Sequence, residues 1–273
     1  MANVPAVVSK RLIANIPKFK KILESARKRD VNESDTVTIV TDMLEQVFGF
    51  DKYTEITREF KTQGLRCDFA IKSGEDIEYL LEVKAIGSEL KSSHLNQAVG
   101  YAIRQGIKWA MLTNGINWEI HRVDCDGKVS HKRLFHFDFL ELNPKNNDHQ
   151  QMLFLLCKRG VAKDLITEYY EYKQSVNRYT IGAVLLTDPV LGAVRREIRR
   201  MKAGLKVSTD DVKEMISSEV LKRDLVESED AERARKQVAK AMKKHEKSKA
   251  KADGSKDREP IAGSENHEDS VPV

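Results

Sequence analysis

The chain has 273 residues, a length that accommodates one sizeable hydrophobic core and an accessory region. Hydrophobic residues make up 40% of it and charged residues 33%, a composition typical of a well-solvated protein, which argues against a membrane-embedded one. The net charge of +5 is only mildly basic, so it does not by itself indicate a nucleic-acid partner.

The three cysteines, Cys67, Cys125 and Cys157, are too few and too far apart for a zinc site or a disulfide framework. This fits a reducing compartment. The N-terminal residues lack a secretory core, and no apolar run reaches the length of a membrane span. We therefore expect a cytoplasmic protein with no membrane contact.

Residues 1–30 predict a basic N-terminal helix. Lysines and arginines recur between Lys10 and Arg29, and Lys20 and Lys21 are candidate contacts to nucleic-acid phosphates. The alternative is a solvated helix face, which charge runs of this kind commonly form.

The next segment begins with a helix and a strand. A helix over Thr36–Phe50 is expected to be capped near Asn32 or Ser34 and to end at Gly49. Thr54–Phe60 then predicts a first strand.

Two further β-type runs, Arg66–Lys72 and Ile77–Lys84, are joined by a Ser-Gly-Glu-Asp turn signal. Side chains alternate between the faces of a strand, so Glu82 and Lys84 point to the same side. If the two runs pair, Asp68 approaches that same edge.

Two carboxylates and an ammonium around one spot suit a hard divalent cation, and the lysine could orient or activate a water there. A metal-dependent phosphodiesterase needs this arrangement. The alternative is a solvated charged rim, because D…E-x-K is a loose pattern. The apolar residues around it, Tyr79–Leu81, Val83 and Ile86, favour function, since they predict a central strand in which unpaired charges are costly.

Leu90–Gly106 predicts an amphipathic helix that carries Gln97 and Tyr101 one turn apart on one face. Taken alone, Gln97 reads as a surface residue and Tyr101 as a half-buried one. Strands are expected over Lys108–Leu112 and Trp118–Val123, on either side of a Thr-Asn-Gly turn. The predicted order is therefore helix, three strands, helix, and one or two further strands, within a domain of residues 31–143.

Leu134–Leu142 and Pro144 predict a connector, and residues 144–244 predict a helical accessory region. Its helices are expected over Asp148–Ser175 with a break at Gly160, Val190–Lys202, Thr209–Lys222 and Ser228–Lys244.

The second of these helices carries Arg195, Arg196 and Arg199, which are candidate phosphate contacts or, alternatively, a solvated face. Residues 245–273 lack apolar periodicity and are expected to be disordered.

Five short pieces, in this order, carry a family resemblance. They are Asn32–Thr36, Cys67–Ile71, Leu80–Ala85, Gln97–Tyr101 and Leu112–Trp118. The set resembles the PD-(D/E)xK nuclease superfamily, and most closely the N-terminal nuclease domain of type I restriction enzyme R subunits.

The resemblance implies roles for particular residues. Asp68 and Glu82 would hold Mg²⁺ or Mn²⁺, and Lys84 would position or activate the attacking water. Gln97 and Tyr101, on the helix beside the central strand, would orient the phosphate or support the metal site.

A helix glutamate usually completes the site in this superfamily. Glu33 matches it by its place at the start of the first helix of the domain, and Glu45 is an alternative whose spacing fits less well. The residue before Asp68 is Cys67 where the family motif has proline.

The implied fold is α/β, with a restriction-endonuclease-like core (a central mixed sheet flanked by helices) followed by an α-helical C-terminal region. The implied function is a Mg²⁺-dependent endodeoxyribonuclease that hydrolyses DNA phosphodiester bonds in restriction or defence. The alternative is a nucleic-acid-binding or assembly protein on an inactive or partner-dependent nuclease scaffold.

No G-x-x-x-x-G-K-[ST] phosphate loop and no helicase-type region is present, so the chain is not expected to translocate DNA alone. DNA is the expected ligand. Double-strand cutting commonly needs two active sites, so a homodimer is one expected assembly, and a subunit of a restriction or defence complex is the other.

Overall fold

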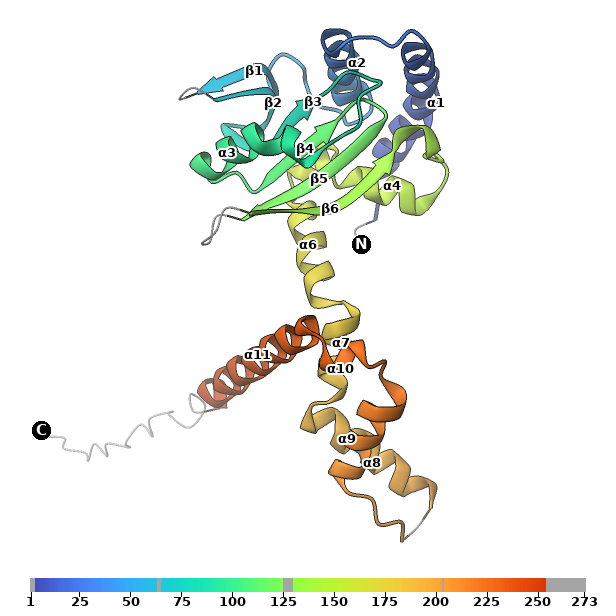
Figure 1. Ribbon diagram of the computed structural model, residues 1–273, viewed down its shortest axis with the longest axis vertical. Coiled ribbons are helices and arrows are strands. Elements are labelled where there is room, and N and C mark those ends of the chain that lie inside the picture. The colour runs from blue at the N-terminus through green and yellow to red at the C-terminus, as the bar shows by residue number, and fades with distance from the viewer. Residues whose placement is uncertain (1–2, 63–64, 125–129, 203, 254–273) are drawn as a thin grey trace, which may run out of the picture. The chain divides into compact units, whose positions relative to one another are not determined.

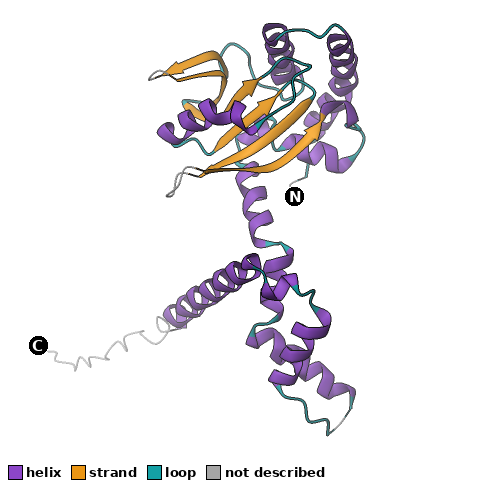
Figure 2. Ribbon diagram, viewed as in Figure 1, coloured by secondary structure: helices purple, strands orange, loops and turns teal. Residues whose placement is uncertain are grey.

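The computed structural model describes residues 3–62, 65–124, 130–202 and 204–253. The chain divides into two compact units, Met1–Tyr172 and Lys173–Val273. The first unit contains a sheet with helices on both faces, and the described part of the second is helical (Figure 2).

The first unit is organised around a six-stranded sheet in which the strands follow one another in chain order. They are β1 (Ile56–Thr62), β2 (Leu65–Ser73), β3 (Asp76–Val83), β4 (Trp109–Thr113), β5 (Asn117–Asp124) and β6 (Ser130–Asp138). β3 and β4 are parallel, and every other neighbouring pair is antiparallel. The parallel pair is connected by a crossover that contains a 3-10 turn, η1 (Ser92–Leu95), and α3 (Asn96–Gln105).

Each face of the sheet has its own core. One core lies between the sheet and α1 (Ala6–Lys28), α2 (Glu33–Gln46) and α4 (Asn147–Phe154), and a smaller one lies under α3 (Figure 1). β3 becomes fully buried towards its C-terminal end, and β4 is buried throughout, as expected of central strands covered on both faces.

Helix caps hold the two helices that border the central strands. The Asn32 side chain accepts a hydrogen bond from the Asp35 N–H and caps α2, while Glu33 and Asp35 in the first turn favour the positive end of the helix dipole. α3 ends at Gly106, which has a φ of 68°, a left-handed conformation that glycine adopts without steric cost.

α1 lies within the predicted basic N-terminal helix of residues 1–30, and it belongs to the main core. One side of it is fully buried against the unit: Val8, Leu12, Ile16, Phe19, Leu23 and Ala26. The basic residues occupy its remaining surface, because a helix in this position must bury its apolar stripe.

The segment after β5 differs most from the sequence prediction. Residues 130–138 form the edge strand β6, although a connector is predicted from Leu134 onward, and the strand is followed by a 3-10 turn, η2 (Phe139–Glu141). The histidines and basic residues of β6 weaken the apolar alternation that would indicate a strand. The segment forms a strand because it pairs with β5.

The first unit continues past residue 143, where the sequence analysis ends the sheet domain. α4, α5 (Lys158–Val161) and the first part of α6 (Leu165–Ser175) contribute Leu153, Phe154 and Ile166 to the main core. Helices end at Phe154 and at Val161, so the segment predicted as one helix with a single break forms three helices.

The described part of the second unit contains short helices and one long one. They are α7 (Arg178–Leu185), α8 (Asp188–Met201), α9 (Thr209–Met215), η3 (Ile216–Val220), α10 (Asp224–Glu227) and α11 (Glu229–Asp253). α7 is not predicted from the sequence. α11 extends through residues 245–253, which are predicted to be disordered, and the rest of that predicted tail, residues 254–273, lies outside the described residues.

The structure therefore bears out an α/β class with a mixed sheet flanked by helices, followed by a helical C-terminal region. None of the helices in the described residues combines the length and apolar composition that a membrane span requires.

Candidate active site

The two carboxylates of the predicted motif come from neighbouring antiparallel strands. Asp68 on β2 and Glu82 on β3 each lie one residue beyond the Phe69–Leu81 pair, so the strand register brings them together. The Val83 N–H donates a hydrogen bond of 2.7 Å to Asp68 Oδ2. This bond ties Asp68 to the end of β3.

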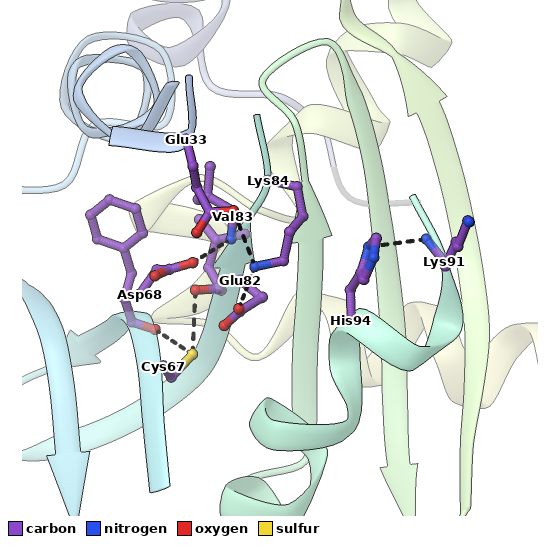
Figure 3. Close-up of polar contacts among 10 residues, drawn as sticks. Glu33, Cys67, Asp68, Glu82, Val83, Lys84, Lys91 and His94 are labelled. Atoms are coloured by element: carbon purple, nitrogen blue, oxygen red, sulfur yellow. Dashed lines mark hydrogen bonds and ion pairs between the residues drawn. The ribbon is translucent and has the colours of Figure 1, made fainter. Parts of the chain in front are cut away.

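Lys84 lies between two glutamates (Figure 3). Its Nζ is 2.7 Å from Glu82 Oε1 and 3.5 Å from Glu33 Oε2. Glu33 is the first residue of α2, so a helix from a distant part of the sequence reaches the end of β3. The Lys84 N–H also donates to the Thr113 carbonyl at 2.8 Å, which continues the β3–β4 pairing past the strand end.

The Thr-Asn-Gly turn after β4 supports this end of the sheet. Asn114 is buried, its side-chain amide donates to the Ser88 carbonyl at 2.9 Å, and its Oδ1 accepts from the N–H groups of Ile116 and Asn117. The loop that follows Lys84 is thereby fastened to the neighbouring turn. The next residue, Gly115, has a φ of 84°, which favours glycine.

Burial dominates the electrostatics of the site. It raises the pKa of the Asp68 carboxyl, against the hydrogen bond from Val83. It also raises the pKa of the Glu82 carboxyl, against the hydrogen bond from Lys84. Burial lowers the pKa of the Lys84 ammonium, but the carboxylates of Glu82, Glu33 and Asp68 outweigh it and the net shift is upward. Lys84 is therefore a charged donor at neutral pH and suits orienting a water better than deprotonating it.

These side chains line one polar cleft of about 370 Å³. Its walls are Glu33, Arg66, Asp68, Glu82, Lys84, Ser93, His94 and Gln97. The structure thus brings together five of the predicted site residues: Glu33, Asp68, Glu82, Lys84 and Gln97. Glu45, the alternative helix glutamate, pairs with Lys52 at 3.2 Å and is not among the lining residues.

Tyr101 is placed differently from Gln97, although both lie on α3. It is 2% exposed, and its ring packs edge-on against Phe60 at a centroid distance of 5.2 Å. Tyr101 belongs to the core under α3 and is not among the residues that line the cleft. In this arrangement its contribution is packing.

Arg66, Ser93 and His94 line the cleft without having been predicted. Arg66 lies two residues before Asp68, so strand alternation places both on one face, a signal that the sequence contained. His94 lies in η1, and its Nδ1 accepts a hydrogen bond of 3.3 Å from the Lys91 N–H. No sequence pattern marks this turn as part of a site.

The basic residues selected from the sequence lie outside the cleft. Lys20 and Lys21 are on α1, and Arg195, Arg196 and Arg199 are on α8 of the second unit. Arg199 donates to the Val207 carbonyl at 2.7 Å, so it helps to hold the turn between α8 and α9.

Cys67, next to Asp68, is a buried structural residue. Its thiol contacts the carbonyl oxygens of Phe69 and Leu81, and burial raises its pKa to about 12. A thiol of this kind is neither a nucleophile nor a metal ligand at neutral pH.

The donor set of the cleft suits Mg²⁺ or Mn²⁺ in one specific way. The described residues contain no group of three or more His, Cys, Asp or Glu side chains that could hold a metal ion. The candidate ligands are the two carboxylates of Asp68 and Glu82. Within the described part of the chain, neither Asp68 Oδ1 nor Glu82 Oε2 accepts a hydrogen bond. Mg²⁺ typically takes one or two carboxylates and completes its coordination with waters and substrate phosphate, so these oxygens fit it.

Asp68→Asn is expected to raise the free energy of unfolding at neutral pH by up to about 1 kcal/mol. Asparagine keeps an acceptor for the Val83 N–H and removes a buried charge. Because the pKa of Asp68 is raised above 3.8 in the folded state, its favourable contribution is fully present below 3.8 and is lost as the pH rises through the folded-state pKa.

Urea unfolding at pH values on both sides of 3.8 measures this effect. The variant and the wild-type protein should coincide at the acid end and separate as the pH increases. An equal gain at every pH would instead attribute the change to packing.

Comparison with protein families, with curated proteins and with solved structures finds no significant match for this chain.

Proposed function

We propose that the protein is a Mg²⁺-dependent endodeoxyribonuclease of the PD-(D/E)xK kind, similar to the N-terminal nuclease domain of type I restriction enzyme R subunits, acting in restriction or defence. The observation that carries the proposal is the convergence of Asp68, Glu82 and Lys84 at one polar cleft. Glu33 and Gln97, from two different helices, complete its walls.

Each residue then has a task that its position allows. Asp68 and Glu82 hold the cation through the carboxylate oxygens that are not engaged elsewhere. The bound Mg²⁺ or Mn²⁺ would supply positive charge beside the scissile phosphate and lower the pKa of a bound water. Lys84, held by Glu82 and Glu33, orients the water, and Gln97 offers an amide to a phosphate oxygen.

Burial of the carboxylates supports catalysis over a purely structural role. An ion pair at a strand end that served only stability would gain little from burial, because desolvation of the charges offsets their attraction. Here the pKa values of both Asp68 and Glu82 are raised by burial, so the pair is held at an energetic cost. Such costs are typical of functional sites.

A second candidate function is nucleic-acid binding or assembly on this scaffold, without cleavage or with cleavage only beside a partner. One observation favours it: a protein cation, Lys84, already contacts both Glu82 and Glu33. In that case the cleft would bind a phosphate without hydrolysing it.

Metal binding and cleavage together test the proposed function. The wild-type protein is expected to bind Mn²⁺ and to cut one or more of supercoiled, linear, single-stranded and branched DNA with Mg²⁺ or Mn²⁺, with no cutting in EDTA. Glu82→Gln should weaken Mn²⁺ binding by more than about tenfold. Loss of a residue that only supports a metal ligand already costs roughly that much, and Glu82 is proposed as a ligand itself.

Glu78→Gln is the matched control. Glu78 lies on the same strand, and burial raises the pKa of its carboxyl too, but it does not line the cleft. Binding of Mn²⁺ that Glu82→Gln leaves unchanged would contradict the proposed site. Metal binding without cleavage of any substrate would favour the second candidate function.

A further inference from the structure

From Lys236 to Lys247, α11 presents lysines on a single face. Lys236, Lys240, Lys243, Lys244 and Lys247 line a shallow groove together with Ala239. Spacings of three and four residues place side chains on one side of a helix. Among the residues that the structure describes, those lining this groove all belong to α11, and none of them is acidic.

The opposite side of α11 packs within the second unit. Ala231 and Ala234 are buried, Val238 and Met242 are half-buried, and the helix contacts α7 and α10. Successive residues turn by about 100°, so this apolar side faces away from the lysines. The packing side is therefore occupied, and the lysine side is left to solvent.

In the described part of α11, the ion pairs lie in the first half of the helix. Arg233 pairs with Glu229 and Asp230, and Lys236 pairs with Glu232 at 2.7 Å. From Lys240 onward, the lysines of the groove form no ion pair within the described residues. Like charges one turn apart destabilise a helix, so this row of lysines weakens the helix that carries it. Figure 1 shows the C-terminal part of α11 extending away from the other helices of its unit.

We propose that this lysine face binds the phosphate backbone of double-stranded DNA. From Lys236 to Lys247 the face spans about 16 Å at about 1.5 Å per residue, enough for several phosphates of one strand, which rise by about 3.4 Å each. Lysine is a point charge that contacts phosphates without reading bases. The surface thus supplies affinity without sequence preference.

The composition of α11 separates this partner from other anionic ones. Residues 229–253 contain no Phe, Tyr or Trp, the large side chains on which unpaired bases commonly stack. They also contain no Leu, Ile, Phe or Trp to insert among lipids, which a helix lying in a membrane surface requires. Duplex DNA carries one negative charge per about 1.7 Å of its axis, a dense line of charge that a row of lysines on one helix face can match.

The test is the salt dependence of DNA binding by the full chain. Binding to a short DNA duplex is measured by fluorescence anisotropy in EDTA, from about 50 mM to about 200 mM salt. The triple variant Lys240→Gln, Lys243→Gln, Lys247→Gln should lower the magnitude of the slope of log K against log salt by about 2 to 3, since each phosphate contact contributes about 0.9. Glutamine has nearly the helix propensity of lysine, and circular dichroism checks that α11 persists.

The matched control is Lys206→Gln, Lys213→Gln, Lys222→Gln, which removes the same charge from exposed positions of the second unit. Its slope should equal that of the wild-type protein. The proposal is overturned if the two triple variants behave alike, if the wild-type chain does not bind the duplex, or if the α11 variant loses only binding to anionic vesicles. Because binding is measured without metal, these outcomes are independent of whether the carboxylate cleft cleaves DNA.

Discussion

Replacing Lys84 with alanine is expected to reduce the rate of metal-dependent DNA cleavage by at least about a hundredfold, the lower range for loss of a group that acts on the attacking water. Lys84 is the cation that lies between Glu82 and Glu33 in the lining of the cleft. Its removal leaves buried carboxylates without their counter-charge and the water without its donor. Initial cleavage rates at saturating Mg²⁺ measure the effect.

DNA binding should survive this substitution, because Lys84 is 20% exposed and reaches only the cleft. Lys52→Ala is the matched control, since Lys52 also loses an ion pair, with Glu45, but lies outside the site. Cleavage that Lys84→Ala leaves intact would remove Lys84 from the mechanism. A loss of cleavage that Lys52→Ala reproduces would show that the effect comes from stability.

Replacing Leu12 with alanine is expected to lower the free energy of unfolding by about 2 to 5 kcal/mol, the cost of truncating a fully buried leucine. Leu12 lies on α1, is fully buried, and belongs to the core on one face of the sheet. Urea unfolding measures the loss, and the first unit should respond as a whole because α1 is part of its core.

The adjacent residue provides the control. Ile13 is 40% exposed, so Ile13→Ala should cost much less than Leu12→Ala although it removes a side chain of similar size from the same helix. Two variants of equal stability would restore the view of residues 1–30 as a separate solvated helix. That result would also contradict the packing of α1 against the sheet.

The central strands and the helix between them were predictable because each carries its signal locally. β2, β3, β4 and β5 lie within a residue or two of their predicted positions, since alternation and turn residues mark them. β6 was not predictable from the sequence, because a half-exposed edge strand with few apolar residues lacks this alternation. It becomes a strand by pairing with β5.

The first unit extends beyond the predicted sheet domain on both sides, for a related reason. The sequence predicts a basic helix in the region of α1 and an accessory helix in the region of α4. Amphipathicity alone does not say which part of the protein will cover the apolar stripe of such a helix. Phe154 and its neighbours belong to the main core, where α4 contacts α1. That partner is in place only once the sheet and its helices are assembled.

The sequence by itself marked the hairpin and the placement of Glu82 and Lys84 on one side of β3 and its end, because strand alternation and the turn signal are local. The pairing that brings Asp68 opposite Glu82 was decided in the folded sheet, where a one-residue register shift between Ile71 and Lys72 changes the partner of each residue beyond it. Only the tertiary structure decided that Glu33, from a helix that precedes the sheet, contacts Lys84, that Tyr101 lies in the core while Gln97 lines the cleft, and that His94 joins it. These outcomes depend on how α2 and α3 pack across the two faces of the sheet. Packing of that kind is a property of segments distant in sequence, and local periodicity does not record it.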